Sequence, residues 1–409
     1  MTRTKRGALR KRPADRETST SPQALPHVPN LQIPRRRWRI TSSLLLVASL
    51  AAVVGFALYQ SRAKVITAED LEKDFGPALR ALNDSYDRPL DPAAREFWKV
   101  DLAAEQQEAK KPPDGFAADR PGAVKPAPFD AKRAMSYLEA LCRIGPRMSG
   151  TDGMKKQQDM LAKHFTDLGG TVSYQRFNTG RAPRLRQQNV DMANMIVSWH
   201  PDRMRRVILC SHYDTRPQAD EEPNDRLRQQ PFISANDGGS GVALLMELAH
   251  HMKDLDTKVG VDFVFFDGEE FIWERGDEYF FGSKYFGADY RKNRGKLEYS
   301  GAVLLDMVGG KNIKFPIEQN SWWKAEKLVR EVWGIAIELR CDAFRGNEYS
   351  KFAVEDDHLA LNRSGIPAID IIDFDYPHWH RITDVPANCS GESLEQVARV
   401  LSVWVQRTK

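Results

Sequence analysis

The most constraining feature of this sequence is the alternation of apolar runs with amphipathic segments from about residue 129 onward. Five runs are typical of buried strands: "NMIVSW", "RRVILCS", "VDFVFF", "GAVLLDMVG" and "PAIDIID". Four segments have helical spacing: "DAKRAMSYLEALCRIG", "GMKKQQDMLAKHFTDLG", "GVALLMELAHHM" and "WWKAEKLVREVWG". Strands that alternate with helices of this length favour a mostly parallel sheet with helices on both faces. We therefore predict an α/β domain over residues 129–409.

A run of twenty uncharged residues, Ile40 to Tyr59, lies near the N-terminus. This length fits the hydrocarbon core of a bilayer, and the basic "RRRWR" before it predicts a cytoplasmic N-terminus. A cleaved signal peptide is the alternative, but the long leader and the long apolar run both exceed the usual signal pattern. We expect a single-pass membrane protein whose main domain is periplasmic, extracellular or lumenal.

The other N-terminal segments have little capacity for a core. Residues 1–39 hold eleven Lys and Arg against two acids and are rich in Pro, Ser and Thr, which indicates a disordered cytoplasmic tail. Residues 60–128 are expected to form a helical stalk and a Pro-rich linker.

Because the net charge of +4 comes from the tail, the main domain is not expected to bind nucleic acid. The four cysteines show no CxxC spacing, which disfavours a cysteine zinc site; one disulfide is permitted, but no pair is indicated.

Acids and histidines follow the predicted strands at their carboxyl ends or stand in a glycine-rich turn, "SANDGGSG". The set is His212, Asp214, Asp237, Asp267, Glu269, Glu270, Asp306, His378 and His380. Ligands of open α/β sheets bind outside the carboxyl ends of the strands, so these side chains are expected at one edge. Any one of them alone is more typical of a turn or a helix cap. Together, His and carboxylate side chains are the ligands of catalytic zinc, and we predict a divalent metal opposite Glu270.

The ordered motifs "SHYDTRP", "SANDGGSGVALLMELA", "FFDGEE", "LLDMVGG", "DDHLALNRSGIPAI" and "YPHWH" resemble the zinc aminopeptidase superfamily, which also contains the glutaminyl-peptide cyclotransferases. The resemblance covers about residues 130–405. It implies that Asp237, Glu270 and His380 hold zinc. It further implies that Glu269 is the general acid and base, with Asp306 as its acidic neighbour.

The resemblance leaves the number of metal ions open. In the aminopeptidases, His212 and Asp306 bind a second metal and Asp237 bridges the two ions. The cyclotransferases have similar residues but use one zinc. One zinc is therefore expected, with a second as the alternative.

Local features favour the cyclotransferase branch. Trp273 follows the paired acids and Trp379 precedes His380, where that branch lines its substrate pocket with Trp. Asp356 resembles the branch residue that contacts the equivalent of Asp306, whereas Asp370 stands where the branch usually has His. The function implied is conversion of the N-terminal Gln of peptides or proteins to pyroglutamate, with release of ammonia. An aminopeptidase is the main alternative, and a non-catalytic receptor on the same fold is a lesser one because such a protein is expected to lose metal ligands.

Overall fold

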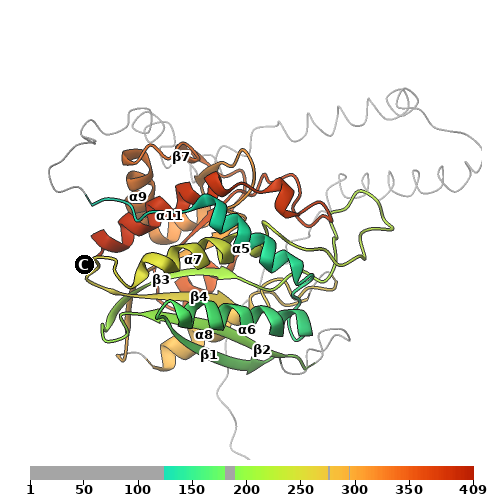
Figure 1. The fold of residues 1–409 in the computed structure, drawn as a ribbon, viewed down its shortest axis with the longest axis horizontal. Coiled ribbons are helices and arrows are strands. Elements are labelled where there is room, and N and C mark those ends of the chain that lie inside the picture. Colours follow the sequence, from blue (N-terminus) through green and yellow to red (C-terminus); the bar gives the residue numbers. More distant parts are fainter. Residues whose placement is uncertain (1–123, 180–188, 275–276, 294) are drawn as a thin grey trace, which may run out of the picture. The chain divides into compact units, whose positions relative to one another are not determined.

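A six-stranded sheet lies at the centre of the computed structural model, which describes residues 124–179, 189–274, 277–293 and 295–409 (Figure 1). Its strands are β1 (Thr171–Asn178), β2 (Asp191–Trp199), β3 (Arg205–His212), β4 (Gly260–Phe266), β5 (Glu298–Asp306) and β8 (Ala368–Ile372). The spatial order is β1-β2-β4-β3-β5-β8. Strands β4, β3, β5 and β8 are parallel, and β2 pairs antiparallel with β1 and β4. The carboxyl ends of four parallel strands therefore meet at one edge.

Helices cover both faces of this sheet. One hydrophobic cluster joins the first face to α5 (Ala131–Arg143), α6 (Asp152–Asp167), α7 (Gly239–Met252), α9 (Gln319–Glu338) and α11 (Gly391–Arg407). A second cluster joins the opposite face to α8 (Phe281–Lys292) and α10 (Asp357–Arg363). The predicted α/β architecture, with a mostly parallel sheet between two helix layers, is confirmed.

Strand β3 shows why the apolar runs are uninterrupted. Val207 and Leu209 belong to the first cluster, whereas Ile208 and Cys210 belong to the second. All four side chains are fully buried. Because successive side chains of a strand point to opposite faces, a strand that is covered on both sides is apolar at every position.

Helix α6 occupies the predicted segment "GMKKQQDMLAKHFTDLG", and local features explain where it begins and ends. The Thr151 side chain accepts a hydrogen bond from the Met154 N–H and caps the first turn. Leu161 and Phe165 are fully buried on the inner face. The helix ends before Gly169, whose φ of +91° lies in the left-handed region that favours glycine.

The structure adds elements that the sequence patterns did not predict. They are β1, α8, α10, α11, a short parallel pair formed by β6 (Phe315–Ile317) and β7 (Phe344–Tyr349), and the 3₁₀ turn η1 (Pro386–Asn388). Helix α10 has only 7 residues, which is too short for a clear helical period. Strand β1 has exposed and partly buried side chains and no apolar run, because it lies at the edge of the sheet.

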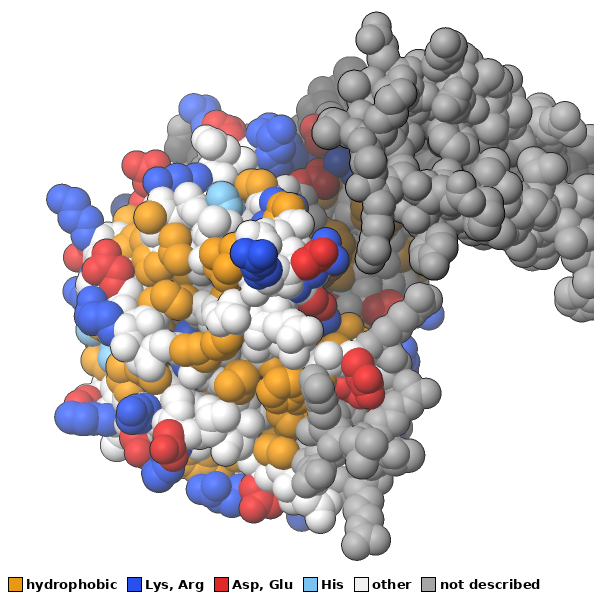
Figure 2. Space-filling model, turned by 90° about the vertical axis from the view of Figure 1, so that its right-hand side faces the viewer, with side chains coloured by type: hydrophobic (Ala, Val, Ile, Leu, Met, Phe, Trp, Pro, Cys, Tyr) orange, Lys and Arg blue, Asp and Glu red, His pale blue; other side chains and the backbone are white. Residues whose placement is uncertain are grey.

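The predicted tail (1–39), the predicted anchor (40–59) and residues 60–123 of the predicted linker lie outside the described residues, so these assignments stay predictions. Within the described part of the chain, no helix is long and apolar enough to cross a membrane. The four cysteines are all described; each is buried and free. On the face that Figure 2 shows, Lys and Arg side chains are interspersed with Asp and Glu. The expectation that the domain does not bind nucleic acid stays a prediction.

Candidate active site

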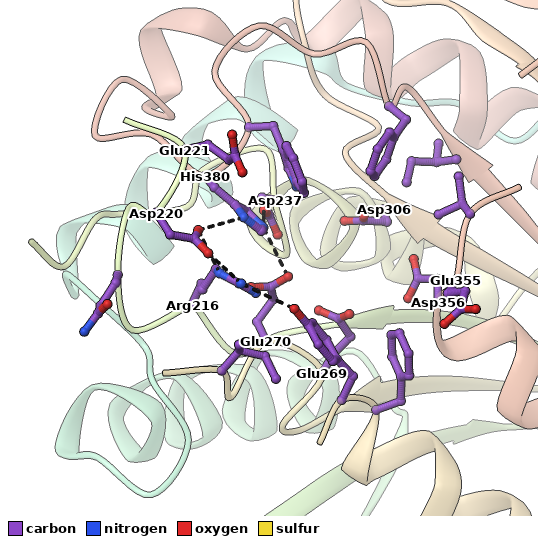
Figure 3. Close-up of a pocket in the computed structure, with 18 of the residues that line it drawn as sticks. Arg216, Asp220, Glu221, Asp237, Glu269, Glu270, Asp306, Glu355, Asp356 and His380 are labelled. Atoms are coloured by element: carbon purple, nitrogen blue, oxygen red, sulfur yellow. Dashed lines mark hydrogen bonds and ion pairs between the residues drawn. The ribbon is translucent and has the colours of Figure 1, made fainter. Parts of the chain in front are cut away.

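A pocket of about 620 Å³ lies where the carboxyl ends of the parallel strands meet (Figure 3). Its wall contains most of the residues that the sequence pointed to, from segments far apart in the chain. They include Asp237, Glu269, Glu270, Trp273, Asp306, Asp356, Trp379 and His380. The predicted convergence of these side chains at one sheet edge is therefore observed.

Asp237, Glu270 and His380 form a first cluster of metal-binding groups. His380 Nε2 lies 3.2 Å from Glu270 Oε1 and 3.5 Å from Asp237 Oδ2. Asp237 comes from the turn before α7, Glu270 from the turn after β4, and His380 from the loop after β8. All three side chains are buried, so their polar atoms face one another rather than solvent.

A second cluster shares Asp237 with the first and adds His212 and Asp306. His212 Nε2 lies 3.1 Å from Asp237 Oδ1 and 3.2 Å from Asp306 Oδ1. The two carboxylate oxygens of Asp237 thus face two different imidazole rings. The two clusters therefore offer ligands for either one metal ion or two.

The electrostatics of the first cluster fit a divalent cation. Among the described residues, Asp237 Oδ2 has no hydrogen-bond partner, although it is buried. Burial raises the pKa of Asp237, and the nearby charge of Glu270 raises it further. Burial lowers the pKa of His380, but Glu270 and Asp220 outweigh it and raise this pKa to about 10. Zinc would neutralise these buried carboxylates, and two carboxylates with one imidazole are among its usual ligands.

The turn that follows β4 positions Glu269 beside the first cluster. Asp214 accepts hydrogen bonds from the backbone N–H groups of Glu269 and Glu270, at 3.2 and 3.0 Å. Burial raises the pKa of Glu269 well above its usual value, and the charge of Glu270 adds to this effect. A carboxyl group with a raised pKa at the wall of a pocket is suited to accept and release protons.

The imidazole of His212 lies so close to the backbone of Gly238, in the "NDGGSG" turn, that this position requires glycine. Gly238 has a φ of +75°, and a Cβ at this position would lie 2.7 Å from His212 Cε1. Only glycine combines the left-handed conformation with this contact. The turn therefore keeps Asp237 within reach of His212.

Further acids lie beside Asp306. Asp356 caps α10 and is buried. Burial and the charge of Asp306 raise the pKa of Asp356 well above its usual value, so the two carboxyl groups interact. Asp370 is fully buried, and among the described residues its carboxylate oxygens have no hydrogen-bond partner. Burial and Asp356 raise its pKa as well, which favours a neutral Asp370.

The two tryptophans line the pocket, whereas His378 belongs neither to the pocket wall nor to the two metal clusters. The Trp379 ring lies 4.0 Å from the His380 ring, centroid to centroid, and Trp273 is on the pocket wall. His378 instead forms a hydrogen bond with Thr383 Oγ1. Proximity to the strand end was therefore not enough to bring His378 into the site.

Arg216 and Asp220 also lie at the site, although neither was among the predicted site residues. Arg216 donates a hydrogen bond to Glu270 at 2.7 Å and two to Asp220 at 3.0 and 2.7 Å (Figure 3). Their only sequence signal is an Arg and an Asp four residues apart in the loop after "SHYDT". Asp384 was not predicted either; its carboxylate accepts hydrogen bonds from the backbone N–H groups of Asn236 and Asp237.

The fold and these clusters are those of a metal-dependent peptidase-like protein. Residues 194–405 match the model of peptidase family M28, so the chain belongs to peptidase family M28. Curated relatives point to a branch of it. A glutaminyl-peptide cyclotransferase from Gloydius blomhoffii is 25% identical over 247 residues, and the match spans 52% of this chain and 64% of that relative.

Solved structures agree with this placement. The crystal structure of Fimbriiglobus ruber glutaminyl cyclase is 46% identical, with a TM-score of 0.67, and the match covers 71% of this chain and 100% of that one. A leucine aminopeptidase precursor from Bacteroides thetaiotaomicron is 29% identical, with a TM-score of 0.64 and coverage of 70% and 100%. The resemblance to the zinc aminopeptidase superfamily, glutaminyl cyclase branch, is confirmed.

Proposed function

We propose that this protein is a zinc-dependent glutaminyl-peptide cyclotransferase that converts the N-terminal Gln of peptides or proteins to pyroglutamate and releases ammonia. The observation that carries the proposal is the buried Asp237, Glu270 and His380 cluster beside Glu269, in a pocket with Trp273 and Trp379 on its wall. The 46% identity to a glutaminyl cyclase supports the cyclotransferase reaction over hydrolysis.

Asp237, Glu270 and His380 would hold the zinc ion, which supplies a Lewis acid that polarises the γ-carboxamide carbonyl of the substrate. The α-amine nitrogen of the substrate forms a bond to that carbonyl carbon, and the bond from this carbon to the amide nitrogen breaks. Glu269 accepts a proton from the attacking amine and delivers it to the leaving nitrogen, which departs as ammonia. Because the attack is intramolecular, the protein mainly folds the Gln side chain into position.

The surrounding residues have supporting roles in this proposal. Asp306 and Asp356 lie on the pocket wall, where their carboxyl groups can orient the substrate amine and leaving nitrogen. The rings of Trp273 and Trp379 limit the access of water to the substrate carbonyl. Exclusion of water favours cyclisation over hydrolysis.

A zinc aminopeptidase is the second candidate, and the cluster of His212, Asp237 and Asp306 favours it. This cluster offers ligands for a second metal ion, and Glu269 would then activate a water molecule instead of an amine. We propose one zinc ion for the cyclotransferase reaction and two for the aminopeptidase alternative. A non-catalytic receptor is disfavoured because all five predicted ligands lie within these clusters.

The test is to incubate the purified full-length chain with Gln-initiated and Leu-initiated dipeptide amides and to identify the products by mass spectrometry. The cyclotransferase gives pyroglutamyl peptide and ammonia from the first substrate and leaves the second intact. Free leucine would instead establish the aminopeptidase. Metal analysis of the same sample counts the zinc ions.

We also propose that residues 40–59 anchor the protein in a membrane, with residues 1–39 in the cytoplasm and the catalytic domain periplasmic, extracellular or lumenal. The uncharged run and the basic residues before it support this proposal.

A further inference from the structure

Two of the three groups in the first metal cluster are connected on their outer sides by an ion-paired bridge. Arg216 Nη1 lies 2.7 Å from Glu270 Oε2. The same guanidinium donates to both carboxylate oxygens of Asp220, at 3.0 and 2.7 Å. Asp220 Oδ1 in turn lies 3.0 Å from His380 Nδ1. Figure 3 shows this chain of contacts from Glu270 through Arg216 and Asp220 to His380.

The bridge uses the atoms of Glu270 and His380 that do not face the metal cluster. Glu270 Oε2 is taken by Arg216, which leaves Oε1 to face His380 Nε2 at 3.2 Å. A carboxylate at His380 Nδ1 favours the tautomer in which Nδ1 carries the proton, so Nε2 keeps a free lone pair. Each contact therefore selects which atom of a ligand is available to zinc.

The loop that carries the bridge also holds the backbone around His380. The Glu221 N–H donates to the His380 carbonyl at 3.3 Å, and Glu222 Oε1 accepts from the Ile382 N–H at 2.9 Å. His380 has a φ of +51°, a conformation that a non-glycine residue keeps only when its surroundings impose it. The contacts of Glu221 and Glu222 supply such surroundings.

The ion pair between Arg216 and Glu270 is buried, unlike an ordinary surface ion pair. Its side chain is 6% exposed, and the Glu270 side chain is 8% exposed. Surface pairs contribute little, but a buried pair that loses one partner leaves an uncompensated charge. Removal of Arg216 would therefore leave Glu270 Oε2 buried without its ion-pair partner and would let the carboxylate reorient.

We propose that Arg216 and Asp220 are positioning residues that fix the ligand atoms of Glu270 and His380 and thereby raise the affinity of the site for zinc. This inference rests on the zinc site of the proposed function, but it holds for either reaction. The bridge acts through Glu270 and His380 and not through the substrate. Outer partners of metal ligands typically change metal affinity by about 10–100-fold when they are replaced.

The test measures the zinc dissociation constant of the full-length protein by competition with a chromophoric chelator. Arg216→Gln and Asp220→Asn are each expected to weaken zinc binding by about 10–100-fold. The double variant is expected to lose little more than the worse single variant, because both changes interrupt one bridge. Arg216→Lys should also bind zinc weakly, because one ammonium group does not reproduce the planar fork that reaches two carboxylates.

Asp225→Asn is the matched control, since Asp225 lies on the same loop and its side chain is 86% exposed. It should bind zinc like the wild type. The melting temperature of each variant in the presence of a chelator tests folding separately; Asp220 is 41% exposed, so Asp220→Asn should stay folded.

The positioning role is refuted if Arg216→Gln and Asp220→Asn bind zinc within about twofold of the wild type, or if Asp225→Asn loses as much affinity as they do. A merely structural role predicts lower melting temperatures with unchanged zinc affinity. A wild-type protein that binds zinc but does not cyclise Gln would contradict the proposed function and leave this comparison intact. A wild-type protein without zinc affinity would overturn both.

Discussion

Replacement of Asp267 by Asn should reveal a buried carboxyl group whose ionisation opposes folding. Asp267 ends the apolar run of β4 and is 1% exposed. Burial and the charge of Asp214 raise its pKa to about 7. The Ser149 hydroxyl donates to Asp267 Oδ1 at 2.6 Å, and the Ala193 N–H donates to Oδ2 at 2.9 Å; both bonds favour the carboxylate. These hydrogen bonds lower the pKa of Asp267, but burial raises it by more.

The raised pKa of Asp267 makes the stability of the folded chain depend on pH. The pKa of Asp267 rises from its ordinary value of 3.8 to about 7 in the folded chain, so the folded state binds the proton more tightly. This contribution to stability is fully present below the unfolded pKa and is lost as the pH rises through the folded pKa. The higher affinity of the folded state for this proton corresponds to about 4 kcal/mol of stability, of which about 3 kcal/mol is lost between about pH 5 and pH 8.5.

The assay compares urea unfolding of the wild type and Asp267→Asn at these two pH values, with chelator present in both so that zinc does not contribute. The Asn side chain does not ionise, so the stability difference should move by about 3 kcal/mol in favour of the variant at the higher pH. Asp225→Asn, on the exposed part of the chain, controls for general charge effects. A difference independent of pH would mean that Asp267 is ionised throughout and that its hydrogen bonds outweigh burial.

Three further outcomes are expected. Glu269→Gln should keep its zinc but lose about 10²–10⁴-fold in turnover, because it keeps the shape of the side chain and removes the base; a zinc-loaded variant with normal rates would contradict the role. Trp379→Ala should lower kcat/KM on the order of tenfold with zinc content unchanged, since the ring packs on His380 and lines the pocket; an unchanged kcat/KM would remove Trp379 from substrate binding. External protease on intact cells should digest the large domain and spare residues 1–39, and the reverse pattern would show that the predicted orientation is wrong.

The sequence by itself determined the class of fold and the segments that supply the site. The uninterrupted apolar runs predicted β3, β4, β5 and β8, because a strand that is covered on both faces is apolar at nearly every position. Strands β3 and β5 end in His212 and Asp306, acids follow β4 and β8 directly, and parallel strands bring such ends to one edge. The ordered motifs then indicated which of these residues resemble zinc ligands.

Only the tertiary structure decided which side chains meet and through which atoms. The position of Asp214 and Asp237 at the predicted sheet edge did not separate their roles, and only the resemblance favoured Asp237 as a ligand. In the structure Asp214 holds the backbone of Glu269 and Glu270, whereas Asp237 lies between the two imidazoles. His380 and not His378 points into the pocket. The direction of a side chain depends on local backbone angles, such as the φ of +51° at His380, that contacts with a distant loop impose.

The Arg216 and Asp220 bridge depends on the tertiary structure most of all. The chain places Arg216 54 residues before Glu270, and Asp220 pairs with a histidine from the loop after β8. No local period or motif encodes such contacts, because they form only when three loops close over one edge of the sheet. The sequence could therefore predict that a metal site exists, and the packing of these loops decided how its ligands are held.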